Sequence, residues 1–128
     1  MFRTGIQQNA EIQHALRGDF GEESIPHSHP YVIEWIISTN ELDDNGFAAD
    51  ISVMEEVLDK TLGDLSGKLL NDLPFFSLRQ PSLENLAVYL HTTLKEKMSE
   101  QNAWQPAMRC AVKIWENDSA WASFSTAP

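Results

Sequence analysis

Residues 26–37 read Pro26-His27-Ser28-His29-Pro30-Tyr31-Val32-Ile33-Glu34-Trp35-Ile36-Ile37. The β-branched and aromatic residues after the second proline are typical of a β-strand, which we expect to run from about His29 to Ser38. Side chains two positions apart point to the same face of a strand. His27 and His29 therefore share one face, and their imidazoles can converge on one point.

Two neutral imidazoles held in this way are good zinc ligands, and a zinc site with one open position needs three protein ligands. His14 is the third candidate, because it lies on an upstream segment that can pair with this strand. The plainer interpretation of the pair is two half-exposed histidines at the entrance of a strand. A zinc site is therefore a hypothesis that depends on the rest of the chain.

Length and charge limit the classes of protein to which the chain can belong. It has 128 residues, 42% of them hydrophobic, and nine basic against nineteen acidic residues give a formal net charge of -10. The length predicts a single domain over residues 1–128, and the charge argues against nucleic acid or an anionic membrane as partner. The single cysteine, Cys110, forms no internal disulfide, and no signal peptide or membrane span is apparent, so we expect a cytoplasmic protein.

The periodicity of the whole chain predicts an α+β fold. An upstream strand is expected within residues 2–16, most clearly over 11–16, and a helix that ends near residue 65 begins at a capping box formed by Ser52 and Glu55. Ser82 caps a second helix that reaches about Met98, and two strands follow at about 107–116 and 120–124. The order β-β-α-α-β-β predicts a four-stranded antiparallel sheet with two helices on one face.

Several short motifs, spread over nearly the whole chain, carry a resemblance. With them the sequence resembles a divergent member of the 6-pyruvoyl-tetrahydropterin synthase / 6-carboxy-tetrahydropterin synthase family. In chain order they are His14, then His27-Ser28-His29-Pro30-Tyr31, Gly46-Phe47-Ala48-Ala49-Asp50-Ile51, Leu70-Asn71-Asp72, Pro81-Ser82-Leu83-Glu84-Asn85-Leu86-Ala87 and Val112-Lys113-Ile114-Trp115-Glu116.

The resemblance implies a tunnelling fold (T-fold), in which subunits join their sheets into a barrel. The chain would then be a homo-oligomer, a hexamer or a tetramer, with pockets between subunits. It also implies zinc held by His14, His27 and His29, and a reduced pterin such as dihydroneopterin triphosphate anchored by Glu116. A carboxylate is suited to this role, because its two oxygens can accept paired N–H bonds from the pterin ring. The family reaction is that of a carbon–oxygen lyase, in which zinc polarises hydroxyls of the substrate.

The residues for proton transfer depart from the family pattern. The catalytic cysteine of the family is replaced here by Glu23, and the residues at the positions of its Asp-His pair are Ser66 and Gly67. Whether the chain is an enzyme is therefore open at this stage. Some family members with glutamate in place of the cysteine resemble enzymes that cleave the pterin side chain, and a carboxylate near zinc can act as a general base. The alternative interpretation of Glu23 is a solvated acidic turn.

Three functions remain compatible with the sequence. The first is a zinc-dependent enzyme acting on a reduced pterin, with chemistry altered through Glu23 as one form of it. The second is a module that binds zinc and a pterin without turnover, and the third is an oligomer in which zinc is purely structural. Other candidate residues have ordinary interpretations: Cys110 as a buried inert thiol, His91 as a half-exposed helix residue, Glu84 as an acid favoured by the helix dipole, and Glu116 alternatively as an exposed acid at a strand end.

Overall fold

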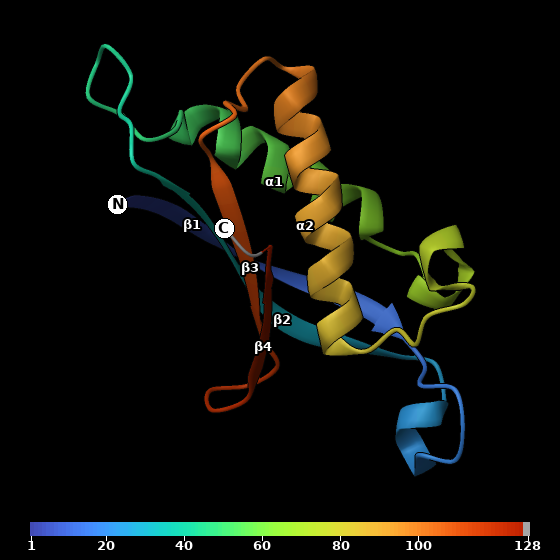
Figure 1. Ribbon diagram of the computed structural model, residues 1–128. Helices are drawn as coiled ribbons and strands as arrows, with labels where there is room; N and C mark the ends of the chain where they lie inside the picture. Colours follow the sequence, from blue (N-terminus) through green and yellow to red (C-terminus); the bar gives the residue numbers. More distant parts are fainter. Residues whose placement is uncertain (127–128) are drawn as a thin grey trace.

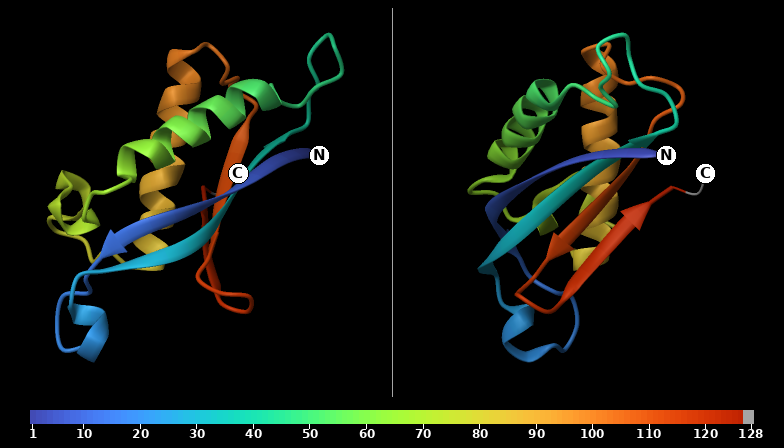
Figure 2. Two further views of the ribbon diagram at one scale, coloured as in Figure 1. Left: turned by 180° about the vertical axis from the view of Figure 1, so that it is seen from behind. Right: turned by 90° about the vertical axis from the view of Figure 1, so that its left-hand side faces the viewer.

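Four antiparallel strands form one sheet in the order β1-β2-β3-β4 in the computed structural model, which describes residues 1–126 (Figure 1). Their bounds are β1 Phe2–His14, β2 His27–Thr39, β3 Arg109–Trp115 and β4 Trp121–Ser125. Two helices, α1 Ile51–Leu65 and α2 Leu83–Glu100, lie in front of the sheet in Figure 1 and behind it in the view from the back (Figure 2). The predicted α+β architecture and its β-β-α-α-β-β order are confirmed.

The first two strands are longer than the sequence predicted. β1 pairs with β2 over its full length, from Phe2 opposite Thr39 to His14 opposite His27. Polar residues such as Gln8 share a face of β1 with Ile6 and weaken its apolar alternation, which is why the sequence predicts a strand most clearly over residues 11–16 and less clearly before them. Because the pairing extends to the last residue of β1, His14 at the end of β1 and His27 at the start of β2 are direct neighbours across the sheet.

Apolar side chains on one face of the sheet form the core against both helices. β2 contributes Ile33, Trp35 and Ile37, all of them fully buried. The helices contribute leucines and methionines at helical spacing, which fill the same layer. The opposite face carries Val32, Glu34 and Ile36 on β2, which are only partly buried, and no described element covers it.

The N-cap residue was predicted correctly for α2 and incorrectly for α1. Ser82 caps α2 as expected, since its side chain accepts a hydrogen bond from the backbone N–H of Asn85 at 3.2 Å. The capping box at Ser52 is wrong, because α1 begins at Ile51 and Asp50 is its N-cap. The Asp50 carboxylate accepts from the N–H of Ser52 at 3.0 Å, so the aspartate already supplies the acceptor that the serine was expected to provide.

The segment between the helices fixes the end of β1. It contains two short 3-10 helices, η2 Leu70–Asp72 and η3 Pro74–Phe76. The Asn71 side chain exchanges two hydrogen bonds with the backbone of Ala15, and the Gln80 side chain does the same with Arg17. Each amide thus pairs with a backbone as a neighbouring strand would, directly after His14, and holds that part of the chain in place.

His91 and Cys110 meet inside the core. His91 was expected to be half exposed, but it is only 4% exposed, because α2 packs this face on β3 and β4. Its Nε2 lies 3.2 Å from the carbonyl oxygen of Cys110, and its ring packs edge-on against Phe124. Burial lowers the pKa of His91 and raises the pKa of Cys110 to about 11, which confirms a buried thiol with little nucleophilic character.

Candidate metal centre

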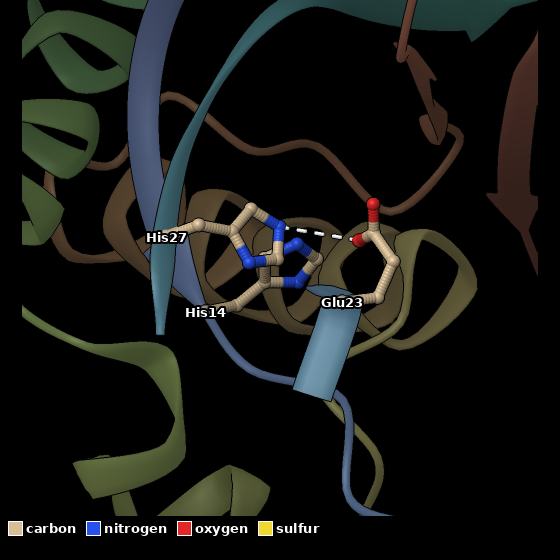
Figure 3. A group of neighbouring side chains, drawn as sticks. All are labelled: His14, Glu23 and His27. Carbon is tan, nitrogen blue, oxygen red and sulfur yellow. Dashed lines mark ion pairs between the residues drawn. The ribbon is translucent and has the colours of Figure 1, made fainter. Parts of the chain in front are cut away.

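His14 and His27 face each other at the ends of β1 and β2, on the face of the sheet that points toward the helices (Figure 3). Their ring centroids lie 4.6 Å apart with an angle of 62° between the ring planes. Their approach follows from the register of the sheet, which makes the two residues direct partners, and from the alternation that sends both rings to one face. The sequence predicted that the segment carrying His14 can pair with the strand of His27, and the register brings the two residues opposite each other. Their role as metal ligands stays a prediction.

Hydrogen bonds fix which nitrogen of each ring can bind a ligand. The Nδ1 atoms of His14 and His27 each lie 2.8 Å from a backbone carbonyl oxygen, that of Pro81 and that of Ile25 respectively. A carbonyl oxygen only accepts, so Nδ1–H must be the donor in both rings. In the neutral rings Nε2 therefore carries the lone pair, and a carbonyl on the opposite nitrogen is the usual companion of a metal-bound histidine.

Glu23 completes a three-residue group. The short 3-10 helix η1, Gly21–Ser24, brings its carboxylate to 3.2 Å from Nε2 of His27. Potential ligand atoms of His14, Glu23 and His27 all lie within 4.8 Å of one another. Nε2 of His27 is buried and has no hydrogen-bond partner among the described residues. A lone pair facing a carboxylate oxygen at this distance is stable only with a proton or a cation between them, so the residues fit a metal ion.

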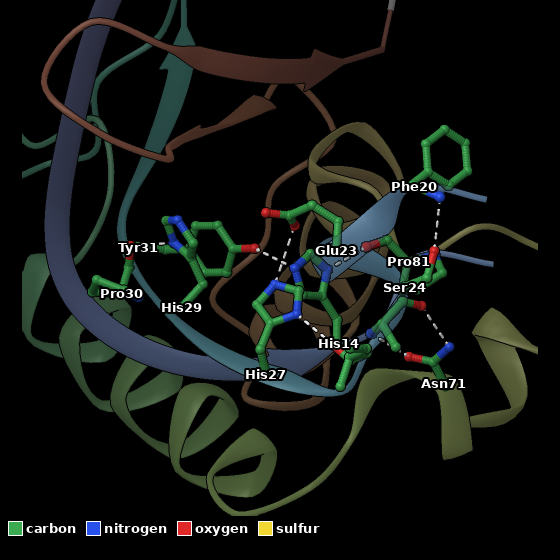
Figure 4. A network of polar contacts seen from close by, with 12 residues as sticks. His14, Phe20, Glu23, Ser24, His27, His29, Pro30, Tyr31, Asn71 and Pro81 are labelled. Carbon is green, nitrogen blue, oxygen red and sulfur yellow. Dashed lines mark hydrogen bonds and ion pairs between the residues drawn. The ribbon is translucent and has the colours of Figure 1, made fainter. Parts of the chain in front are cut away.

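His29 lies apart from this group. Its Nδ1 is 2.8 Å from the carbonyl oxygen of Pro30, and its ring stacks on that of Tyr31 with centroids 4.8 Å apart (Figure 4). The structure therefore brings together two of the three predicted histidines, and the three-histidine ligand set stays a prediction. Glu23 was predicted only as a catalytic residue, because its place in the connection before β2 gave no sign that its side chain reaches His27.

A pocket of about 330 Å³ opens beside the group and connects it to Glu116. Glu116 directly follows β3 and lines this pocket together with His14, Glu23 and Tyr31. Burial raises the pKa of Tyr31, and the negative charges of Glu116 and Glu23 raise it further. The hydroxyl of Tyr31 also lies 3.4 Å from Nε2 of His14, so the tyrosine links the histidines to the acid predicted to hold the pterin.

The two positions that replace the family's Asp-His pair lie outside the pocket. Ser66 caps the C-terminus of α1, and Gly67 follows it in the left-handed conformation with φ of 75°. Neither residue lines the pocket beside His14. Among the described residues that line it, the titratable side chains are those of His14, Glu23, Tyr31, Glu84 and Glu116.

A family model described as 6-pyruvoyl tetrahydropterin synthase matches residues 6–127 of the sequence. The chain belongs to the 6-pyruvoyl tetrahydropterin synthase family. A search of curated protein sequences found no match.

Solved structures of the 6-pyruvoyl tetrahydropterin synthase family share the fold at low sequence identity. The enzyme from Caenorhabditis elegans is 20% identical, with a TM-score of 0.80 over 98% of this chain and 96% of that chain. A catalytic-residue mutant of the Plasmodium vivax enzyme, with glutamate replaced by alanine, is 14% identical, with a TM-score of 0.79 over 98% and 97%. The Plasmodium falciparum enzyme is 13% identical, with a TM-score of 0.75 over 98% and 97%. No helix within residues 1–126 has the length and apolar character needed to cross a bilayer.

Proposed function

We propose that the protein is a zinc-dependent member of the 6-pyruvoyl tetrahydropterin synthase family that binds a reduced pterin and moves protons on its side chain through Glu23. The observation that carries the proposal is the convergence of His14, His27 and Glu23 within 4.8 Å. These three residues lie beside a pocket that also contains Glu116. The membership in the family supports the choice of a pterin, and imidazole and carboxylate donors suit zinc.

His14 and His27 are the ligands of the ion in this proposal, each through Nε2. The carbonyl oxygens of Pro81 and Ile25 orient the rings and increase the basicity of the ligating nitrogens. The third ligand is either Glu23, which already lies within reach, or His29, which reaches the site after its ring leaves Tyr31. The bound ion would polarise the hydroxyl groups of the pterin side chain.

Glu116 holds the pterin in this proposal. Its carboxylate can accept two parallel N–H bonds from the amino-pyrimidinone edge of the ring, which orients the ring side chain toward the histidines. Its backbone is held by a hydrogen bond from the Glu116 N–H to the carbonyl oxygen of Ala120, at 2.9 Å, across the turn that joins β3 and β4. The acid therefore sits on a hairpin rather than on a free loop end.

Glu23 is the proton acceptor in this proposal when His29 takes the third ligand position. A carboxylate held beside the ion can remove the proton of a side-chain hydroxyl, and general bases of this kind typically contribute a factor of about 10² to 10⁴ to the rate. The Plasmodium vivax relatives support the role, since their descriptions name a glutamate as a catalytic residue of those proteins. Glu23 acting as a base on a side-chain hydroxyl is suited to a reaction that cleaves the pterin side chain.

Product analysis tests the enzyme hypothesis. Zinc-loaded protein is incubated with reduced pterins, and binding and products are followed together. Glu23→Gln should abolish product formation while binding persists, and Glu116→Ala should abolish binding. Glu22→Gln is the matched control, because Glu22 is exposed, lies on the same 3-10 helix and lies outside the group of ligand atoms. Turnover that survives Glu23→Gln would exclude Glu23 as the base.

A second candidate function is a protein that binds zinc and a pterin without turnover. Ser66 and Gly67 favour it, because they stand where the family has proton-transferring side chains and they lie outside the pocket. In the same experiment this function gives tight binding that depends on Glu116, and no product with any variant. The absence of any pterin binding would leave only a structural role for the zinc.

Assembly and location complete the proposal. We propose a homo-oligomer, a hexamer or a tetramer, whose sheets join into a barrel, since within residues 1–126 the outer edges of β1 and β4 pair with no other strand. The exception is a single bridge from Gln13 near the end of β1 to Leu69. Open strand edges of this kind favour pairing with another copy.

We also propose that the protein works in the cytoplasm, because its one cysteine is buried and unpaired and suits a reducing compartment.

A further inference from the structure

The side chain of Tyr31 lies beside the candidate metal centre. It projects from β2 on the face that carries His27 and His29, and only 3% of the residue is exposed. Its ring stacks on that of His29, and its hydroxyl points toward His14 (Figure 4). The residue also lines the pocket that contains Glu116. Tyr31 therefore places a buried hydroxyl between the candidate metal ligands and the pocket.

This hydroxyl is a hydrogen-bond donor with a weakly held partner. Within residues 1–126 its partner is Nε2 of His14, at 3.4 Å. Nδ1 of the same ring donates to the carbonyl oxygen of Pro81, so Nε2 of the neutral ring accepts and the proton of this contact belongs to Tyr31. A distance of 3.4 Å is long for a hydroxyl donor, whose usual range is about 2.5 to 3.0 Å. The contact therefore holds the hydroxyl only loosely.

A metal ion at His14 removes this acceptor. In the proposed site the ion is bound by the lone pair of Nε2, which is the lone pair that accepts from Tyr31. One lone pair cannot serve both partners, so the hydroxyl loses its acceptor when the ion binds. Because a buried hydroxyl without a partner costs free energy, it will turn to another oxygen within its reach.

The oxygens near this hydroxyl belong to two carboxylates and to a bound ligand. The carboxylates whose negative charges raise the pKa of Tyr31 are those of Glu116 and Glu23, and both line its pocket. In the proposed function Glu116 accepts from the N–H groups of the pterin ring, and Glu23 binds the ion or takes a proton from the substrate. The acceptor left for Tyr31 is an oxygen of the pterin side chain, which this function directs toward the histidines.

We propose that Tyr31 is a substrate-binding residue whose hydroxyl donates a hydrogen bond to an oxygen of the pterin side chain when a metal ion occupies Nε2 of His14. The inference rests on the proposed pterin and metal site, and it adds a residue that recognises the side chain rather than the ring. A reduced pterin with an oxygen on its side chain is then preferred over one without it, because the second ligand leaves the hydroxyl unpaired.

The test compares two reduced pterins by calorimetry on the zinc-loaded protein. Dihydroneopterin carries hydroxyl groups on its side chain, and 6-methyl-dihydropterin carries no oxygen there. Tyr31→Phe removes the hydroxyl and keeps the ring that stacks on His29. The variant should bind dihydroneopterin about three- to tenfold more weakly than the wild type, the usual effect of one hydrogen bond, and should bind 6-methyl-dihydropterin no more weakly.

Zinc affinity without any pterin gives a second readout, measured by competition with a coloured chelator. Because the hydroxyl of Tyr31 competes with the ion for Nε2 of His14, the Tyr31→Phe variant should bind zinc at least as tightly as the wild type. Tyr89→Phe is the matched control, since Tyr89 packs against Phe75 and Phe76 outside the pocket. It should change neither zinc affinity nor the binding of either pterin.

The outcomes separate this inference from the proposed function. A loss for dihydroneopterin alone, with zinc affinity kept, supports the inference. Unchanged binding of dihydroneopterin, an equal loss for both pterins, or weaker zinc binding by the Tyr31→Phe variant overturns it and leaves the proposed pterin site intact. The same selective loss with Tyr89→Phe also overturns it. If the wild type binds neither pterin, the proposed site is overturned, and this inference with it.

Discussion

The carboxylate of Glu23 and Nε2 of His27 lie 3.2 Å apart, and the Nδ1 atom of the same ring already donates to the carbonyl of Ile25. Such a pair requires positive charge between its atoms, either a proton on the ring or a metal ion. His14 supplies a second Nε2 to the same point from β1. At the scale of the residue, the candidate site is therefore a place where protons and metal ions compete for the same nitrogen atoms.

His91 makes the stability of the protein depend on pH. Burial, the larger influence on this ring, lowers the pKa of His91 below its ordinary value of 6.5, although the Cys110 carbonyl opposes the shift. As pH falls through about 6.5, the unfolded chain takes up a proton at His91 before the folded protein does, so the free energy of unfolding decreases. We expect His91→Gln to reduce the slope of this free energy between pH 7 and pH 5, measured by urea unfolding. An unchanged slope would contradict this account.

At the scale of the element, strand pairing was predictable and local rotations were not. The two-residue period of β2 was sufficient to place His27 and His29 on one face, and pairing with an upstream strand was sufficient to add His14. The rotation of the His29 ring onto Tyr31 depends on packing and on the carbonyl of Pro30, which a spacing pattern does not contain. Glu23 comes from a 3-10 helix in a connection, where sequence gives little information on side-chain direction.

The sequence predicted the start of α1 at the wrong residue because it does not show the local conformation of the backbone. Asp50 and Ser52 are both good N-cap residues, and only the conformation of the backbone selects between them. Because Asp50 accepts from the N–H groups of Ser52 and Val53, we expect Asp50→Ala to lower the free energy of unfolding by about 1 kcal/mol. Ser52→Ala should change it by less than about 0.5 kcal/mol. Urea unfolding of the two variants checks the assignment, which a larger loss with Ser52→Ala would contradict.

At the scale of the whole molecule, the sheet has one covered face and one open face. The helices bury the core on one side, while the other side carries a groove of about 700 Å³ that is lined by Glu34, Trp115 and Glu116 among others. The fold class and the order of elements were predictable because each element has a distinct hydrophobic period. The arrangement of copies was not, since it depends on the shape and charge of whole surfaces.

The proposed assembly has a direct expected outcome. Because β1 presents a long unpaired edge among the described residues, we expect the protein to associate with further copies of itself through its strand edges. Light scattering coupled to gel filtration should give a mass of four or six times 14.5 kDa. A mass of one chain at micromolar concentration would contradict the proposed barrel of subunits, and it would mean that the pocket beside Glu116 is complete within one subunit.

The most direct test of the metal centre is the zinc content and zinc affinity of the purified protein, measured by elemental analysis and by competition with a coloured chelator. About one zinc per chain is expected for the wild type and for Glu22→Gln. His14→Ala and His27→Ala should each weaken zinc binding at least about a hundredfold. Comparison of His29→Ala with Glu23→Gln then identifies the third ligand. A wild-type protein that binds no zinc, or His14 and His27 variants that bind it as tightly as the wild type, would contradict the account.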